Sequence, residues 1–400
     1  MLTVTRDRVL PTTVTGSYPK PQWYSLDLQG RPLKSALGHT PFREQYLDMV
    51  ASTMAEQAAA GLDIVTDGDA RFDLSVGGKS WMFYVLERLA GLTGRRDLAP
   101  NWSSNDFDIR PGHILYEVME AYQAPAVTSE FGRGPLEYAA VWKSAQRLSD
   151  RPVKFGTISA QCLVRMIWNE FYPSEREMIL ALSRVMNEEL RELADAGCPL
   201  IQIEEPRHHL ASMSPTVTDD DFAFFTEAFN IEVKGIESEI WVHTCWGNPC
   251  QQRLFTPVPS YERVLPYLDA LHADAITFEC ASTGGRDLAL IARAITSKKI
   301  GIGVVNHTST IVERPSDVAA LIRKALEYIP VERLIISTDC GFGREGLSRR
   351  IAFYKCVALV QGTNIVRREL GLPEMPIRAA DPQLAFTPPR VDLPPLEILR

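Results

Sequence analysis

From residue 153 onward, short apolar runs alternate with stretches in which apolar residues recur every three to four positions. A short apolar run between turn residues is typical of a buried strand, and the longer spacing is typical of an amphipathic helix. The alternation therefore predicts a series of β/α units. Their strands are expected at 153–160, 199–205, 238–245, 274–280, 300–306 and 333–340, and their helices around 174–196, 218–233, 259–271, 286–297, 315–328 and 346–366.

Two further units precede this series. The run at 12–18 is followed by a helical pattern around 43–60, and the run at 62–69 begins after Gly61, which favours a helix end there. Eight β/α units predict an α/β protein with a (β/α)8 TIM barrel. A doubly wound open sheet is the alternative, but no dinucleotide-binding glycine fingerprint follows the first strand. We expect a single barrel domain over residues 1–370.

The stretch at 71–150 does not follow this repeat and is rich in aromatic residues. It falls between the second and third predicted strands, so it would leave and re-enter the barrel at its carboxyl-terminal face. We interpret it as a lid or a small subdomain over the active site. The alternatives are an insertion without a catalytic role and an oligomer contact.

The C-terminal residues 371–400 are rich in proline, which is typical of an extended segment. We expect this extension to pack on the outside of the barrel or on a neighbouring subunit. The second arrangement predicts a homo-oligomer in which subunits exchange this arm.

Composition and charge narrow the classes of function. Hydrophobic residues make up 45% of the chain and charged residues 23%, which predicts a large core and no compositional disorder. The formal charge of −8, with no Lys/Arg run longer than two residues, argues against nucleic-acid binding. The N-terminus lacks the apolar core of a signal peptide, and no apolar run approaches the ~20 residues of a membrane span, so we expect a cytoplasmic protein. Seven scattered cysteines then indicate buried thiols, a metal site or a reactive thiol.

The ends of the predicted strands carry residues that bind metals. In TIM barrels, catalytic groups lie at the carboxyl ends of the strands. His243 and Cys245 end the fifth predicted strand, and their spacing of two places both on the same side. Glu279 and Cys340 end the sixth and eighth. Imidazole, thiolate and carboxylate are zinc ligands, so these four residues predict a Zn²⁺ site in which Glu279 is the exchangeable ligand.

Each of these residues alone has a simpler interpretation. Buried cysteines often pack as small apolar side chains, and a single strand histidine is commonly a hydrogen-bonded core residue. Because all four lie at strand ends on one face, the metal site is the favoured interpretation. The remaining cysteines are interpreted as packing residues: Cys162, Cys198, Cys250, Cys280 and Cys356.

Several strand-end motifs resemble those of one known family. They are Gly16-Ser17-Tyr18-Pro19, Ile201-Gln202-Ile203-Glu204-Glu205-Pro206 and His243-Thr244-Cys245, together with Glu279 and Cys340. In this combination the chain resembles the catalytic barrel of the cobalamin-independent methionine synthase family. The resemblance covers most of the chain and is looser across 71–150.

The resemblance implies a thiol methyltransferase. Zinc would bind a thiol such as homocysteine and lower its pKa, and the thiolate would attack a methyl donor. In the family the donor is a methylated folate, and Glu279 would yield its place on the metal to the substrate sulfur. Ser17, Asp69 and Glu204 would bind the amino-acid part of the substrate, since acidic groups attract an ammonium. A helix cap or a structural ion pair is the alternative for Asp69 and Glu204.

Two departures from the family concern the donor. The second barrel that helps to hold the folate in longer members has no counterpart in these 400 residues, so the chain resembles a short, single-barrel branch. The family's acid histidine aligns with Thr308, and His307 stands one residue earlier. Either His307 acts in its place, as a catalytic residue beside Glu279, or the proton is handled otherwise. The donor is therefore folate-like or another small molecule.

Other functions stay open on these observations. Epoxyalkane:coenzyme M transferases are similar single-barrel relatives that open an epoxide with a thiolate at a zinc site. Their sulfonate-bearing substrate needs cations, for which Arg71, Lys79, Arg344 and Arg349 are candidates. A metal-free lyase resembling uroporphyrinogen decarboxylase and a non-catalytic binding protein on a barrel are the further alternatives.

Overall fold

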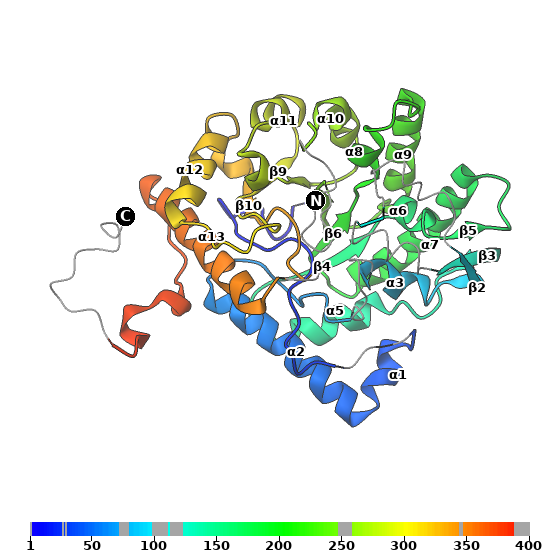
Figure 1. The fold of residues 1–400 in the computed structure, drawn as a ribbon, viewed down its shortest axis with the longest axis horizontal. Coiled ribbons are helices and arrows are strands. Elements are labelled where there is room, and N and C mark those ends of the chain that lie inside the picture. Colours follow the sequence, from blue (N-terminus) through cyan, green and yellow to red (C-terminus); the bar gives the residue numbers. More distant parts are fainter. Residues whose placement is uncertain are drawn as a thin grey trace.

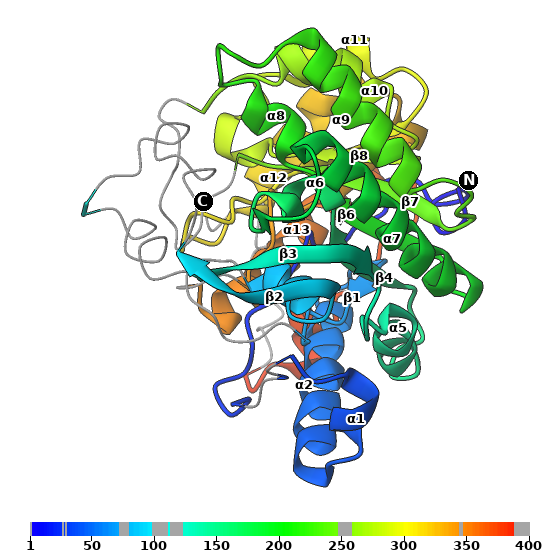
Figure 2. The same ribbon diagram turned by 90° about the vertical axis from the view of Figure 1, so that its right-hand side faces the viewer.

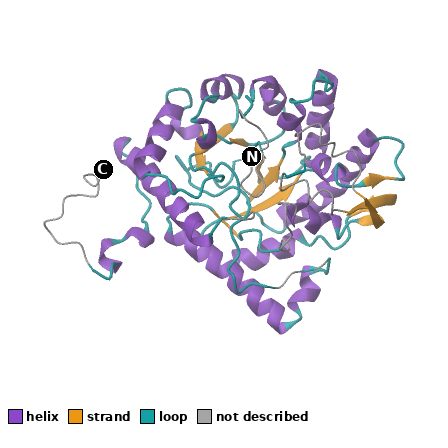
Figure 3. Cartoon of the chain, in the orientation of Figure 1, coloured by secondary structure: helices purple, strands orange, loops and turns teal. Residues whose placement is uncertain are grey.

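The structure is a computed structural model, and it describes residues 2–25, 28, 30–71, 80–97, 111–112, 123–246, 258–343 and 347–387. Helices surround a central group of strands (Figure 1). Colouring by secondary structure shows the strands at the centre of the molecule, apart from one small group at its edge (Figure 3). The α/β fold class predicted from the alternating pattern is confirmed.

The central sheet is parallel, and its seven described strands follow the order β1-β4-β6-β7-β8-β9-β10. Neighbours in space are thus neighbours in the series of β/α units, as in a barrel. Nearly all residues of these strands are buried, which is typical of a parallel sheet that is covered on both faces. The strands are β1 (Val65–Thr66), β4 (Val153–Ile158), β6 (Leu200–Glu204), β7 (Glu239–Thr244), β8 (Ala275–Phe278), β9 (Lys299–Gly303) and β10 (Leu334–Ser337).

The first predicted strand, at 12–18, forms only an isolated parallel bridge between Thr12 and Ile336. Thr13 N–H also donates to Ile336 at 3.0 Å, and Ile64 N–H donates to the carbonyl of Thr12 at 3.1 Å. The segment therefore lies between β10 and β1, the two edges of the sheet, and the fold is TIM-barrel-like. A longer ladder is prevented because Pro11 has no N–H and Gly16 has a positive φ of 66°.

Helices lie outside the sheet and follow the strands along the chain (Figure 1). The predicted start of a helix at Thr218 is confirmed, because Thr218 and Asp221 form a reciprocal capping box. The longer helices are α2 (Thr40–Ala59), α5 (Tyr138–Gln146), α7 (Glu175–Asp195), α9 (Asp219–Glu232), α12 (Pro315–Leu326) and α13 (Arg349–Glu369). The shorter ones are α1 (Leu33–Leu37), α3 (Ser80–Leu86), α6 (Ala160–Val164), α8 (Arg207–Ala211), α10 (Leu265–Asp269) and α11 (Leu288–Ala294), with 3-10 turns η3 (Glu262–Val264), η4 (Ala281–Thr283), η5 (Val331–Arg333), η6 (Arg378–Ala380) and η7 (Pro382–Leu384).

The region predicted as an insertion, 71–150, contains two kinds of structure where it is described. Strands β2 (Ala90–Asp97) and β3 (Gln123–Gly132) pair antiparallel, and β5 (Trp168–Asn169) adds to β3 to form a small separate sheet. Figure 2 shows β2 and β3 side by side. Helix α5 instead packs against β4 and α7 and takes the place of a barrel helix. The role of this region as a lid stays a prediction.

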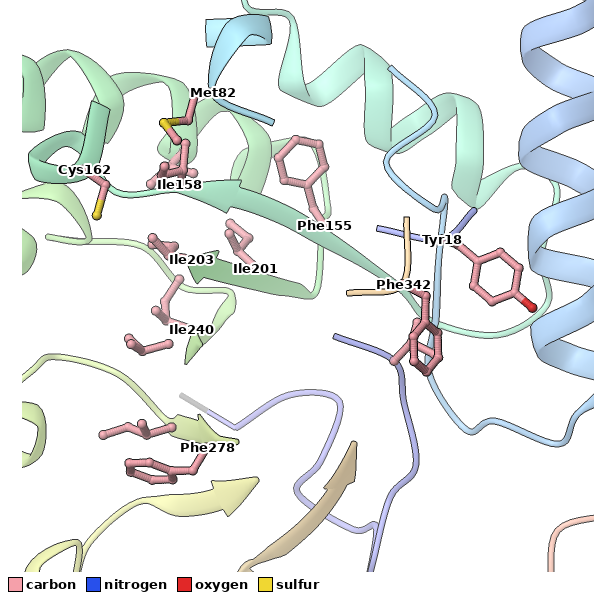
Figure 4. Close-up of a cluster of buried hydrophobic side chains, with 14 of the residues drawn as sticks. Tyr18, Met82, Phe155, Ile158, Cys162, Ile201, Ile203, Ile240, Phe278 and Phe342 are labelled. Carbon is pink, nitrogen blue, oxygen red and sulfur yellow. The ribbon is translucent and has the colours of Figure 1, made fainter. Parts of the chain in front are cut away.

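Alternate residues of β6 point to opposite faces of the sheet. Ile201 and Ile203 belong to the large apolar cluster between the strands and the helices (Figure 4). Leu200 belongs to a small second cluster on the enclosed face, with residues of β7, β8 and β10. Gln202 and Glu204 follow Leu200 on that enclosed face, so polar side chains replace apolar ones toward the carboxyl ends of the strands.

The N-terminal residues cover the amino end of the sheet. The carboxylate of Glu239, at the start of β7, accepts hydrogen bonds from the backbone N–H groups of Thr3, Val4 and Thr5 at 3.0, 2.9 and 3.0 Å. Lys299, at the start of β9, donates to the carbonyl of Thr5 at 2.5 Å. These contacts satisfy two buried charged groups with backbone partners and fix the N-terminal segment.

The described part of the C-terminal extension, up to residue 387, lies outside the helix layer (Figure 1). Leu384 is 61% exposed and Phe386 is fully exposed. A homo-oligomer that covers this arm stays a prediction. No described helix is both long and apolar enough to cross a membrane.

Candidate metal and substrate site

Three of the four predicted metal ligands lie together at the carboxyl end of the sheet. His243 belongs to β7, Cys245 follows that strand, and Cys340 follows β10. One ligand atom from each lies within 4.8 Å of the other two, and all three residues are buried. The two Sγ atoms are 3.3 Å apart, well beyond the ~2.05 Å of a disulfide bond, so Cys245 and Cys340 are both thiols and not a disulfide.

Hydrogen bonds select the tautomer of the His243 ring. Its Nδ1 lies 2.7 Å from the hydroxyl of Thr277 on the neighbouring strand β8. The Thr277 hydroxyl donates to the carbonyl of Val242 at 3.4 Å, so it accepts a hydrogen from Nδ1. The lone pair is thereby left on Nε2, which is the arrangement that a neighbouring acceptor gives to metal-binding histidines.

The surroundings of Nε2 favour a positive charge there. This atom is buried, makes no hydrogen bond to any residue that the structure describes, and lies 3.8 Å from Oε2 of Glu204. Burial lowers the pKa of His243, but the carboxylate of Glu204 and the thiol of Cys340 act in the opposite direction and raise it overall. A cation bound between Nε2 and the two thiols would meet the same attraction.

Glu279, the predicted fourth ligand, belongs to a neighbouring group. Its Oε2 accepts the backbone N–H of Trp246 at 2.9 Å, and its Oε1 accepts the hydroxyl of Ser282. Its carboxylate lies within 4.8 Å of ligand atoms of His307 and Asp339. The structure thus brings together the two predicted catalytic residues, Glu279 and His307, but does not place Glu279 in the His/Cys/Cys group.

Asp339 is a member of the site that the sequence analysis did not assign. Its carboxylate accepts the backbone N–H groups of Cys280 and Ala281 at 2.8 Å and of Ser282 at 2.7 Å. It therefore fixes the loop that follows Glu279 and joins it to the strand end that carries Cys340. Burial and the nearby carboxylate of Glu279 raise the pKa of Asp339. Its position directly before Cys340 was the only signal in the sequence.

Glu204, a predicted substrate-binding residue, adjoins the metal ligands. Its partner across the β6–β7 pairing is His243. Its Oε1 accepts a hydrogen bond from the amide of Gln202 at 2.9 Å, and a Cβ added at Gly16 would lie 3.8 Å from the same oxygen. The ends of β6, β7 and the first segment therefore meet around this carboxylate.

Ser17 follows Gly16 and packs against the loop after Cys340. Its carbonyl accepts the N–H groups of Phe342 and Gly343 at 2.7 and 2.9 Å. A Cβ at Gly343 would approach Oγ of Ser17 to 2.6 Å, so only glycine allows this contact. The predicted residue Ser17 thus lies beside the strand end that supplies a metal ligand.

Asp69 lies beside Gly156 of β4, where an added Cβ would be 3.5 Å from Oδ1 of Asp69, and it has a positive φ of 55°. It forms an ion pair with Arg71 at 3.3 Å. Burial raises the pKa of Asp69 to about 7, with a lowering contribution from Arg71 and raising contributions from Asp67 and Glu204. The ion-pair interpretation of Asp69 is thus present in the structure, together with its closeness to Glu204.

Two of the four cations considered for a sulfonate are described, and both have partners within the protein. Arg71 is buried, donates to the carbonyl of Gly156 at 2.5 Å and lies over the ring of Phe155. Arg349 pairs with Glu56 at 3.1 Å. Lys79 and Arg344 lie outside the described residues.

The fold and the site together define a TIM-barrel-like α/β protein with a His/Cys/Cys group suited to a metal ion at the carboxyl ends of its strands. The profile of the cobalamin-independent synthase catalytic domain matches residues 115–358, which include the three grouped ligands, Glu204 and Glu279. The chain therefore belongs to the cobalamin-independent methionine synthase family, which is a family of methyltransferases. The resemblance found in the sequence motifs is confirmed.

Individual relatives match most of the chain. The methionine synthase of Saccharolobus islandicus (strain Y.G.57.14) is 30% identical over 363 residues, which cover 90% of this chain and 96% of that protein. The methionine synthase of Thermococcus kodakarensis is 30% identical over 367 residues, or 91% and 95% of the two chains. Both matches extend well beyond the region of the profile.

Solved structures agree on the fold. A B12-independent methionine synthase from Shewanella sp. W3-18-1, in complex with selenomethionine, superposes with a TM-score of 0.71 at 24% identity and covers 91% of this chain and 99% of that one. A vitamin-B12-independent methionine synthase, described as putative, from Listeria monocytogenes gives a TM-score of 0.64 at 17% identity, with coverage of 90% and 99%.

Proposed function

We propose that the protein is a zinc-dependent methyltransferase that moves a methyl group from a folate-like or other small donor to the thiol of homocysteine. The observation that carries the proposal is the buried Nε2 of His243, which lacks a hydrogen-bond partner among the described residues and is grouped with the thiols of Cys245 and Cys340. A buried polar nitrogen without a partner is costly, and a metal ion is the partner that fits this set of donors.

His243, Cys245 and Cys340 would hold the ion, since two thiolates and an imidazole are typical zinc ligands. Bound there, zinc would lower the pKa of a substrate thiol so that it is a thiolate at neutral pH. Glu279 is the candidate for the fourth position. To occupy the fourth position, the carboxylate of Glu279 has to leave the N–H of Trp246 and the hydroxyl of Ser282. The same two hydrogen bonds would hold the carboxylate when the substrate sulfur occupies that position.

The charges around Asp69 favour an acceptor that carries an ammonium. The carboxyl groups of Asp67, Asp69 and Glu204 gather around the cations Arg71 and Lys154. One added positive charge would balance this group, whereas a sulfonate would add a second uncompensated negative charge. An amino-acid thiol such as homocysteine therefore fits better than coenzyme M. The Shewanella relative is in complex with selenomethionine, which is an amino acid, and this agrees with an amino-acid ligand for the present protein.

His307 is the candidate acid that protonates the leaving group of the methyl donor. It is buried and lies with Glu279 and Asp339, one strand away from the metal ligands. A carboxylate within reach of an imidazole stabilises the protonated ring, which is the form that can give up a proton. Its position beside Glu279 would place the proton near the reacting sulfur and the departing group.

Bound zinc per chain, measured on freshly purified protein, is the first test. We expect one zinc per chain in the wild type and its loss in Cys245→Ser. The control is Cys198→Ser, because Cys198 is buried before β6, on the amino side of the sheet, and its thiol donates to the carbonyl of Leu200. A Cys245→Ser protein with full zinc and full activity would overturn the metal assignment. A metal-free but active wild type would instead favour the lyase alternative.

Titration of the zinc-loaded protein with homocysteine and with coenzyme M then tests the acceptor. Binding of a thiol as thiolate releases a proton, which a pH indicator in weak buffer detects. We expect proton release with homocysteine only. A response to coenzyme M alone would replace methyl transfer by the epoxide-opening reaction.

A further inference from the structure

A buried lysine lies on the enclosed face of the sheet, near the candidate substrate-binding residue Glu204. Lys154 of β4 is 2% exposed. Its ammonium donates to the carbonyl of Val14 at 2.7 Å and to Oε1 of Gln202 at 2.6 Å, and it lies 5.1 Å from the centre of the Trp241 ring. Burial lowers the pKa of Lys154 to about 7, although the carboxylates of Glu204 and Asp69 act in the opposite direction. A lysine at this depth has a large desolvation cost, so its presence calls for a role.

The lysine determines which way the amide of Gln202 faces. An ammonium can only donate, so it must meet the amide oxygen, and the amide NH2 must face away from it. On that other side, Nε2 of Gln202 donates to Oε1 of Glu204 at 2.9 Å. Gln202 and Glu204 are two residues apart on β6 and therefore share the enclosed face. The three side chains form a hydrogen-bonded series that runs from the ammonium of Lys154 through the amide of Gln202 to the carboxylate of Glu204.

The amide of Gln202 fixes one carboxylate oxygen of Glu204. Oε1 is held by Gln202, while Oε2 faces Nε2 of His243 at 3.8 Å. The hydrogen bond from Gln202 fixes the orientation of the carboxylate. Glu204 can then receive a ligand ammonium without first changing its orientation.

We propose that Lys154 and Gln202 are positioning residues that hold Glu204 ready for the α-ammonium of the acceptor amino acid. This inference rests on the proposed function, in which Glu204 binds that ammonium. Lys154 and Gln202 do not touch the acceptor; they act through Glu204. Their contribution is therefore to the affinity for an amino-acid thiol and not to metal binding or to the methyl-transfer step.

The test compares two thiols by calorimetry on the zinc-loaded full-length protein: homocysteine and 4-mercaptobutanoate, which lacks only the α-amino group. Gln202→Glu is the first variant, since a glutamate still accepts from Lys154 but has no N–H for Glu204. We expect homocysteine affinity to fall about tenfold or more and the affinity for 4-mercaptobutanoate to stay the same. Tm should fall, because the new carboxylate would lie against that of Glu204. In turnover, KM for homocysteine rises while kcat is retained.

Lys154→Met is the second variant, and Lys299→Met is its matched control. Lys299 is also a buried strand lysine bound to backbone carbonyls, of Thr5 and Arg8, but at the start of β9 and not in the hydrogen-bonded series to Glu204. Lys154→Met should reduce homocysteine affinity as Gln202→Glu does, with zinc content retained. Lys299→Met should lower Tm and leave both affinities as in the wild type.

The outcomes separate the two proposals. If both Gln202→Glu and Lys154→Met keep the wild-type preference for homocysteine over 4-mercaptobutanoate, the positioning role is wrong and the acceptor assignment stands. If the wild type itself binds both thiols equally, no ammonium is recognised, and the proposed acceptor and the inference built on it fail together. If Lys299→Met lost the preference as well, the effect of Lys154 would be a general consequence of removing a buried charge.

Discussion

Replacing Thr277 by valine tests how the candidate ligand His243 is oriented. The Thr277 hydroxyl, which is buried on β8, holds Nδ1 of His243 at 2.7 Å and leaves the lone pair on Nε2. Valine keeps the shape of the side chain but removes the acceptor. The ring is then free to carry its hydrogen on Nε2, and this tautomer cannot bind a metal ion.

The size of the effect follows from this contact. Loss of a hydrogen bond that leaves a buried N–H unpaired costs about 1–3 kcal/mol. Loss of an outer partner of a metal-binding histidine lowers metal affinity about 10- to 100-fold, which corresponds to about 1.4–2.7 kcal/mol. We therefore expect Thr277→Val to weaken zinc binding by this factor and to lower the free energy of unfolding of the metal-free protein by about 1–3 kcal/mol.

Competition with a chromophoric chelator measures the zinc affinity, and denaturant unfolding of the metal-free protein measures stability. Thr244→Val is the matched control, because the buried Thr244 hydroxyl donates to the carbonyl of Thr277 at 2.9 Å and is not bonded to the imidazole. It loses a comparable hydrogen bond and should keep zinc affinity within about threefold. Wild-type zinc affinity in Thr277→Val, or equal losses in both variants, would refute the reasoning about the tautomer.

Three other predictions use features away from the metal ligands. Burial raises the pKa of Glu232 to about 8, so this group stabilises the fold at low pH and that stability is lost as the pH rises through about 8. Glu232→Gln, which can still accept the N–H of Ala160, should therefore flatten the fall in Tm between about pH 5 and pH 9. An unchanged Tm profile would contradict this. Thr218→Ala removes the capping box of α9 and should cost about 1 kcal/mol in urea unfolding without a change in zinc content. A Cβ at Gly303 would lie 2.5 Å from the Cα of Asp339; Gly303→Ala should therefore cost about 3 kcal/mol or more and reduce zinc content, and a normal Tm would show that β10 shifts freely.

The strand-end pattern identified most of the site because chain geometry enforces it. Parallel strands that follow one another in a barrel-like sheet bring their carboxyl ends together, so His243, Cys245 and Cys340 meet although almost a hundred residues separate the last two. Local pattern could not determine the direction of the Glu279 side chain, which depends on the Trp246 amide and the Ser282 hydroxyl.

Other features were missed for equally physical reasons. Lys154 and Gln202 each stand inside an apolar run, where the periodicity that predicts a strand says nothing about a polar side chain on the enclosed face. Helix α5 was assigned to the insertion because its aromatic residues, Tyr138 and Trp142 among them, resemble those of the preceding stretch. The first segment appeared as a full strand because apolar pattern does not register the break in pairing caused by Pro11 and Gly16.

The contacts of the N-terminal segment have a consequence for synthesis of the chain on the ribosome. Thr3 meets its partner Glu239 across 236 positions of sequence, Thr5 meets Lys299 across 294, and Thr12 bridges to Ile336. Because translation proceeds at about 5–20 residues per second, the first residues made wait for tens of seconds before their partners exist. Until then the segment around Thr12 lacks its β10 neighbour and has an unpaired edge, and chaperone binding to nascent chains should persist until the β10 segment has left the exit tunnel.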